Sequence, residues 1–198
     1  GNFSVGDYFK NEAIEFAFEL LTGEEWFAIP KELLYVTVYP DDHEAYQKWI
    51  EVGLDEAHIV KLEENFWEIG EGPCGPDSEI FFDRGEKYDP NHDALDKFKQ
   101  DEEQERFVEI WNNVFSQFNS KEGIPRSEYK ELPSKNIDTG AGLERWCCVF
   151  QNVHSTFETE LFQPIIKHIE QLVRFSYEGQ KEFKIIPDHI RAITFALA

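Results

Sequence analysis

Ile137-Asp-Thr-Gly-Ala-Gly-Leu-Glu-Arg145 is the most informative stretch of this chain, because a glycine turn leads there directly into an apolar run. Gly140 and Gly142 let a backbone approach a flat or charged ligand closely. Arg145 offers a fork of donors suited to a phosphate, and Asp138 is placed to hold an ammonium group. The same spacing also describes a plain turn before a helix with Arg145 in a surface ion pair, and spacing alone does not decide between the two.

A second stretch, Asn65-Phe-Trp-Glu-Ile-Gly-Glu-Gly-Pro-Cys-Gly-Pro-Asp-Ser-Glu-Ile-Phe-Phe-Asp-Arg84, contains a rigid turn expected at 70–76. Glu79 and Asp83 are four residues apart, which on a strand puts both carboxylates on one face, where they could share a Mg²⁺ ion. Solvent-facing carboxylates are the commoner explanation of that spacing. Trp67 is either a wall of a small apolar pocket or, more commonly, a core residue.

A third stretch, Glu109-Ile-Trp-Asn-Asn-Val-Phe-Ser-Gln-Phe-Asn119, alternates polar and apolar residues. Asn112 and Val114 would share one face of a strand. An amide beside a small β-branched side chain suits a pocket for a very small substrate. A strand with one polar residue is again the commoner explanation.

The periodicity of apolar residues predicts the helices and strands. Helices are expected at 7–21 with Asp7 as the cap, from Asp41 or Asp42 to Gly53, at 157–175, and from 188 onward. Strands are expected at 33–39, 58–62, 65–69 and 79–82. The apolar faces of the first and third helices would be Ile14, Ala17, Phe18 and Leu21, and Leu161, Ile165, Ile169 and Leu172.

Three segments are less regular. Residues 86–106 are polar and charged, which indicates a mobile surface insertion or a short exposed helix. Residues 107–118 are ambiguous between helix and strand, and 121–134 resemble a loop. Because strands and helices do not alternate regularly, we expect an α+β fold with a mostly antiparallel β-sheet flanked by helices, and not a doubly wound sheet.

Composition excludes several classes of protein. The chain carries 19 Lys and Arg against 40 Asp and Glu, a net charge of −21, so it should not bind RNA tightly by itself. Its three cysteines, with Cys147 and Cys148 adjacent, form no disulfide framework and no zinc-binding spacing, so we expect a reducing, cytoplasmic compartment and buried thiols. No apolar run is long enough for a membrane span.

Taken together and in this order, the stretches resemble the alanyl-tRNA synthetase family of class II aminoacyl-tRNA synthetases, over nearly the whole chain. Residues 1–10 resemble the end of motif 2, and 138–145 resemble motif 3. The other matching segments are Asn65-Phe-Trp67, Gly72–Pro76, Ser78–Phe81, Trp111-Asn112 with Phe115, Gln117, Phe118 and Asn119, Phe157–Phe162, and Asp188–Ala192.

The resemblance implies an enzyme that activates alanine with ATP and Mg²⁺ and passes the alanyl group to tRNA. It implies two catalytic residues, Asp138, which binds the substrate ammonium group, and Arg145, which holds the ATP phosphates beside Gly140 and Gly142. Trp67 and Val114 resemble walls of the alanine pocket, with Asn112 and Gly140 next to them. Zinc belongs in this family to a separate editing domain that this chain lacks.

The resemblance also implies that the chain is an incomplete class II catalytic core. Motif 1 and the first strand of motif 2, with its ATP-binding arginine, would lie before residue 1. Residues 1–185 would be part of the aminoacylation domain, and 186–198 the start of a helical tRNA-recognition region. We therefore expect the 198-residue piece to be inactive and not to bind tRNA. The alternative is a free-standing synthetase-like protein that acts as a non-catalytic binding module.

Overall fold

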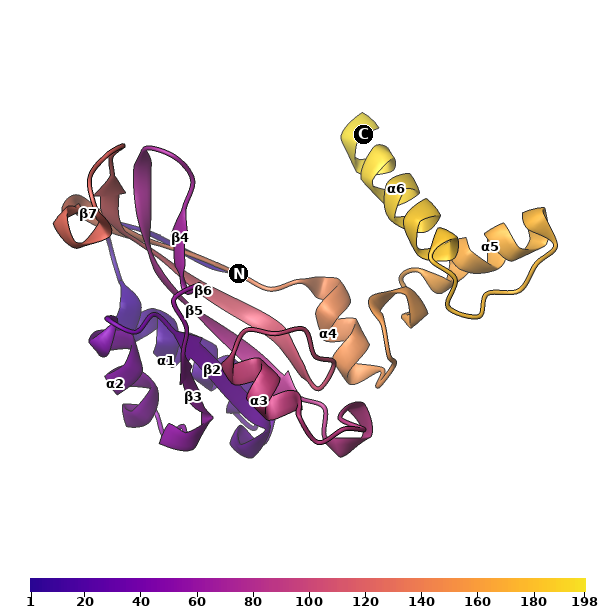
Figure 1. The fold of residues 1–198 in the computed structure, drawn as a ribbon, viewed down its shortest axis with the longest axis horizontal. Coiled ribbons are helices and arrows are strands. Elements are labelled where there is room, and N and C mark those ends of the chain that lie inside the picture. The colour runs from indigo at the N-terminus through magenta and orange to yellow at the C-terminus, as the bar shows by residue number, and fades with distance from the viewer. The chain divides into compact units, whose positions relative to one another are not determined.

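A computed structural model describes residues 1–198, which form two compact units, Gly1–Gly142 and Leu143–Ala198. The first unit is built on a seven-stranded sheet in the order β1-β7-β6-β5-β2-β3, with β4 paired to β5 (Figure 1). Every pair is antiparallel except β2 with β3, which confirms the α+β prediction. The strands are β1 (Asn2–Val5), β2 (Leu34–Val38), β3 (Ile59–Lys61), β4 (Phe66–Glu68), β5 (Gly72–Asp83), β6 (Phe107–Ser120) and β7 (Lys130–Gly140).

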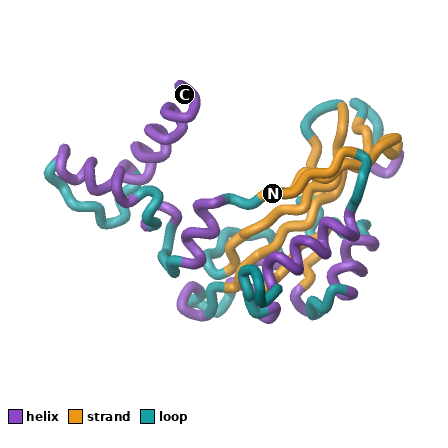
Figure 2. The backbone as a smooth tube through the Cα atoms, turned by 180° about the vertical axis from the view of Figure 1, so that it is seen from behind, coloured by secondary structure: helices purple, strands orange, loops and turns teal.

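Helices accompany the sheet in the first unit and make up the second. The first unit contains α1 (Lys10–Thr22), α2 (His43–Glu51) and α3 (Ala94–Lys99), and the second contains α4 (Leu143–Phe150), α5 (Gln163–Val173) and α6 (Glu182–Leu197). None of these helices has the length and apolar composition that a membrane span requires. In the first unit, α1 and α2 lie against one face of the sheet, and α3 packs on the other (Figure 1, Figure 2).

The first helix has the predicted apolar face but a different start. Ile14, Ala17 and Leu21 are fully buried. The helix begins at Lys10, where the Glu12 carboxylate accepts the Phe9 backbone N–H at 3.3 Å. The prediction that Asp7 caps this helix is therefore wrong, because its backbone N–H is bound in a turn after β1.

The second helix starts at the predicted aspartate. Asp42 Oδ1 accepts the backbone N–H of Ala45 at 3.2 Å and the Lys10 ammonium at 2.8 Å. At the other end the chain turns away through Gly53, whose φ of +102° suits glycine. The Trp49 indole donates to Ser78 Oγ at 2.8 Å, which fixes α2 on β5.

Residues 70–76 were expected to form a turn, and this prediction is wrong from Gly72 onward. Gly72–Pro76 open β5, which pairs with β4 on one side and β6 on the other. The register with β6 shifts between Cys74 and Asp77, so Pro76 has no regular partner on β6, whereas on the other side it lies opposite Phe66 of β4. Pairing with a strand some 40 residues away therefore overrides the turn propensity of Gly and Pro.

Gly75→Ala is expected to destabilise the sheet. An added Cβ would lie 2.1 Å from the main-chain oxygen of Phe115, a backbone atom that no rotamer change can move. We expect a loss of about 1–3 kcal/mol, measured by denaturant unfolding of the full-length protein. Gly140→Ala is the control, because a Cβ there meets nothing within 4 Å. Equal unfolding midpoints for the two variants would contradict the prediction.

The segment 86–106 contains a short helix, α3, as one of the two expected alternatives had it, but this helix is partly buried. Tyr88, Ala94 and Phe98 are buried, and α3 packs against Val60, Leu62 and Phe107. A cluster of ion pairs also joins this segment to the end of β5. The Arg106 guanidinium donates to both carboxylate oxygens of Asp83, at 2.6 and 2.7 Å, and to Asp89 at 3.3 Å.

Four further segments differ from expectation in their structure, their boundaries or the residues that they bury. The ambiguous segment 107–118 is the strand β6, and the expected loop 121–134 already contains the start of β7 at Lys130. In the second unit, Ile166 and Ile169 of α5 pack with Phe162 and Phe183, while Leu172 of the predicted stripe is 70% exposed. The last helix starts at Glu182, so the functional boundary expected after residue 185 falls inside α6.

Candidate functional site

The register of the strands places most of the predicted pocket residues on one face of the sheet. Val114 on β6 lies opposite Asp138 on β7 and opposite Asp77 on β5. Asn112, two residues before Val114, lies opposite Gly140. Directly opposite residues, and residues two apart on a strand, project to the same face. Asn112, Val114, Asp138 and Gly140 therefore form one surface, which we call the pocket face.

The pocket face is open, whereas the reverse face is covered. Asp138 and Gly140 are exposed, and Asn112 and Val114 are half-buried. The intervening residues Asn113, Phe115, Ile137 and Thr139 point the other way and are at most 2% exposed. Within the first unit a ligand can thus reach these strands from only one side. A cavity of about 430 Å³ lined by Lys10, Asp42 and Gln117 lies on the reverse side, away from this face.

Trp67 lies on the same side of the sheet. Its strand, β4, places it opposite Gly75, which precedes Asp77 by two residues. The indole N–H donates to the main-chain oxygen of Phe115 at 3.2 Å, next to Val114 on β6. The half-buried ring of Trp67 is therefore attached to β6 next to Val114, and its role as a pocket wall stays a prediction.

Asp77 belongs to this face and was missed by sequence reasoning. It is 7% exposed, and Asn65 Nδ2 donates to its Oδ1 at 2.7 Å. Burial raises the pKa of Asp77 to about 6, against the opposing effect of the Asn65 hydrogen bond. In the sequence, Asp77 stands between Pro76 and Ser78, directly after the segment 70–76. Because that segment was assigned to a turn, the position of Asp77 on a central strand was not recognised.

Glu79 and Asp83, the predicted carboxylates for a shared Mg²⁺ ion, are each bound by another protein group in the structure. Both oxygens of Asp83 are bound by Arg106, and Oδ1 also accepts the Gly85 N–H at 2.8 Å. Glu79 accepts from Asn112 Nδ2 at 3.3 Å. Nowhere in the described chain do three or more His, Cys, Asp or Glu side chains cluster as a metal site. Spacing within β5 could not reveal that an arginine 23 residues later occupies the carboxylate.

The predicted ATP-binding residues Gly140, Gly142 and Arg145 fall in different units. Gly140 and Gly142 belong to the first unit, as does the predicted ammonium partner Asp138, whereas Arg145 lies in the first turn of α4 in the second. The surroundings of Gly140 leave room for a close approach, since an added Cβ there would meet no atom within 4 Å.

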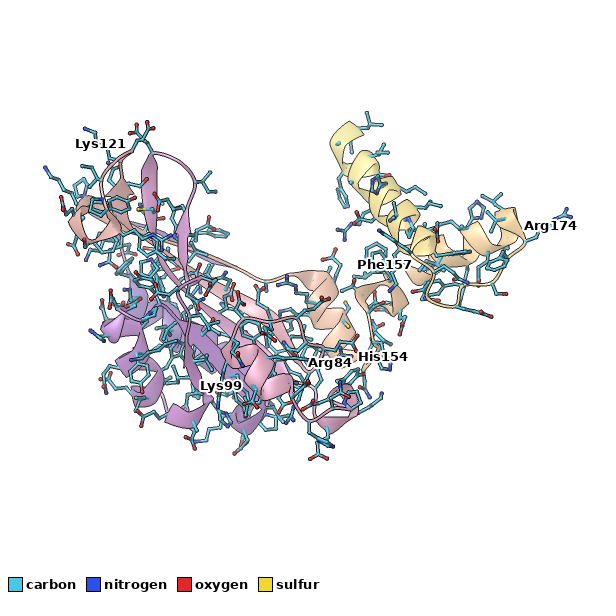
Figure 3. The ribbon with its side chains drawn as sticks, in the orientation of Figure 1. Arg84, Lys99, Lys121, His154, Phe157 and Arg174 are labelled. Atoms are coloured by element: carbon cyan, nitrogen blue, oxygen red, sulfur yellow. The ribbon has the colours of Figure 1, made fainter.

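Basic side chains are spread over the first unit. Lys121, in the turn between β6 and β7, lies far from Lys99 at the end of α3 and from Arg84 after β5 (Figure 3). These three cations therefore do not form one patch of the kind that holds a phosphate backbone.

Comparison with known proteins identifies the family. The family described as tRNA synthetases class II (A) matches residues 1–198. Alanine–tRNA ligase of Lactococcus lactis subsp. cremoris is 58% identical over 200 aligned residues, and that of Streptococcus mutans is 56% identical. Each alignment covers 100% of this chain but 23% of the relative, so the chain spans about a quarter of the length of these relatives. The chain therefore belongs to the class II (A) tRNA synthetase family.

Proposed function

We propose that the protein to which this chain belongs activates alanine with ATP and transfers the alanyl group to tRNA. In the first step an oxygen of the alanine carboxylate bonds to the α-phosphorus of ATP, and pyrophosphate leaves. The relatives reported above are named alanine–tRNA ligases. The structural observation that supports the proposal is the pocket face, where a carboxylate, an amide, a small apolar side chain and an unobstructed glycine meet across two strands.

Each residue then has a role that its chemistry allows. Asp138 would pair with the substrate ammonium group, since a carboxylate is the natural partner of a cation taken out of water. Val114 and Trp67 would enclose the methyl group, and Asn112 would bind polar atoms beside it. Gly140 would let the nucleotide or the amino acid approach the backbone.

ATP would enter as its magnesium complex, and we assign no metal ligand on this chain. Arg145, with Gly142, would hold the phosphates. We assign no zinc site here either, because zinc would belong to a separate editing domain. Residues 1–185 would form part of the aminoacylation domain and 186–198 the start of the tRNA-recognition region, in a cytoplasmic enzyme. With a charge of −21, this chain would leave most of the tRNA contacts to other parts of the protein.

ATP–pyrophosphate exchange by the full-length protein tests this function. We expect exchange that depends on alanine, with kcat/KM for glycine and serine lower by about 10-fold to 200-fold, because neither a missing methyl group nor an added hydroxyl group changes binding in a small pocket by more than a few kcal/mol. Binding of ATP or alanine without any exchange would instead show a non-catalytic binding module.

A further inference from the structure

Asn65 and Asp77 are joined at two points. The backbone N–H of Asp77 donates to the Asn65 main-chain oxygen at 3.0 Å, and the Asn65 amide donates to Asp77 Oδ1 at 2.7 Å. Both residues are buried, at 2% and 7% exposure. The two hydrogen bonds close residues 65–77 into a loop that contains all of β4 and the start of β5. A buried carboxylate without a donor would cost free energy, so this pairing fixes the base of the loop.

Trp67 is carried by that closed loop. It lies two residues after Asn65 and opposite Gly75, which itself lies two residues before Asp77. The tryptophan and the Asn65–Asp77 pair therefore face the same side of the sheet. The loop is anchored a second time on β6, because the Trp67 indole donates to the Phe115 oxygen at 3.2 Å.

The glycine at position 75 makes the second anchor possible. A side chain there would meet the same Phe115 oxygen at 2.1 Å. Absence of a Cβ thus lets β6 approach the loop closely, at the residue that follows Val114. Asp77 is in turn directly opposite Val114. The Asn65–Asp77 pair and Trp67 therefore meet β6 at adjacent residues, Val114 and Phe115.

We propose that Asn65 and Asp77 are positioning residues that hold Trp67 against Val114 and so set the size of the amino-acid pocket. The inference rests on the proposed function and deepens it. Neither residue needs to touch the substrate. Small displacements of a pocket wall have large effects on how well a small substrate is oriented and distinguished from its neighbours in size.

The test compares amino-acid selectivity in the full-length enzyme, measured by exchange and normalised to titrated active sites. Asn65→Ala and Asp77→Ala are each expected to lower the ratio of kcat/KM for alanine over serine by about tenfold, with the KM for ATP unchanged. The double variant should lose no more than either single variant, because both remove one interaction. Asp77→Asn keeps an acceptor for the Asn65 amide and should retain a ratio within about twofold of the wild type.

Tyr129→Phe is the matched control, since it removes a 2.7 Å hydrogen bond to Glu68 on the same strand β4 at an exposed site. Its alanine-to-serine ratio should not change. The inference is overturned if both alanine variants keep the wild-type ratio, if their effects add, or if Asp77→Asn or Tyr129→Phe loses selectivity to the same extent. A wild-type enzyme with no alanine-dependent exchange would overturn the proposed function, and this inference with it.

Discussion

Asp138→Asn in the full-length enzyme is expected to raise the KM for alanine by about 100-fold, or close to 3 kcal/mol. The substitution keeps the shape of the side chain and an acceptor oxygen but removes the charge. An ammonium group bound in a small pocket would then lack its anionic partner, and leaving one member of such a pair unpaired costs several kcal/mol. Exchange kinetics at varied alanine concentration measure the effect, and the KM for ATP should change far less.

Asp7→Asn provides the matched control, because it makes the same charge change at an exposed carboxylate outside the pocket face. Its alanine KM should equal that of the wild type. Substitutions of Val114 and Trp67 should instead change the preference among alanine, glycine and serine, since these side chains shape the pocket without pairing the charge. If Asp138→Asn left the alanine KM within about threefold, the role assigned to Asp138 would be wrong.

Arg106→Met is expected to cost about 2–3 kcal/mol of stability. The Arg106 guanidinium binds both oxygens of Asp83, whose side chain is 8% exposed, and methionine would leave that carboxylate without its cation. The figure lies below that for a fully buried pair because 22% of the Arg106 side chain is exposed. Denaturant unfolding of the full-length protein, followed by a probe in the first unit, measures the loss.

Arg126→Met is the control for charge removal alone. Arg126 pairs with Glu68 at 3.5 Å, and its side chain is 44% exposed, so we expect a change below about 1 kcal/mol. Adding Asp83→Asn to Arg106→Met should recover part of the lost stability, because the neutral amide no longer needs a cation. Equal losses for the two arginine variants would show that the Asp83–Arg106 pair does not stabilise the segment 84–106.

Local sequence pattern determined the elements whose physical cause is itself local. Ile14, Ala17 and Leu21 are spaced three and four residues apart, which places them on one face of a helix, and all three are buried. Asp42 caps α2 through an amide only three residues later. The combined stretches around Trp67, Asn112 and Asp138 also carried the resemblance to alanyl-tRNA synthetases, and the family match over the whole chain agrees with it. These signals need no knowledge of distant partners.

Tertiary structure alone decided which strands and charges meet. Gly72–Pro76 form a strand because β4 and β6 supply the hydrogen-bonding partners, although the segment has the composition of a turn. Asp83 is bound to Arg106 because the chain returns antiparallel along β6. Asp77 lies on the pocket face because the antiparallel register of β5 and β6 places it opposite Val114. Periodicity is a property of neighbouring residues, whereas strand register and buried ion pairing depend on contacts closed over long loops, which local sequence does not specify.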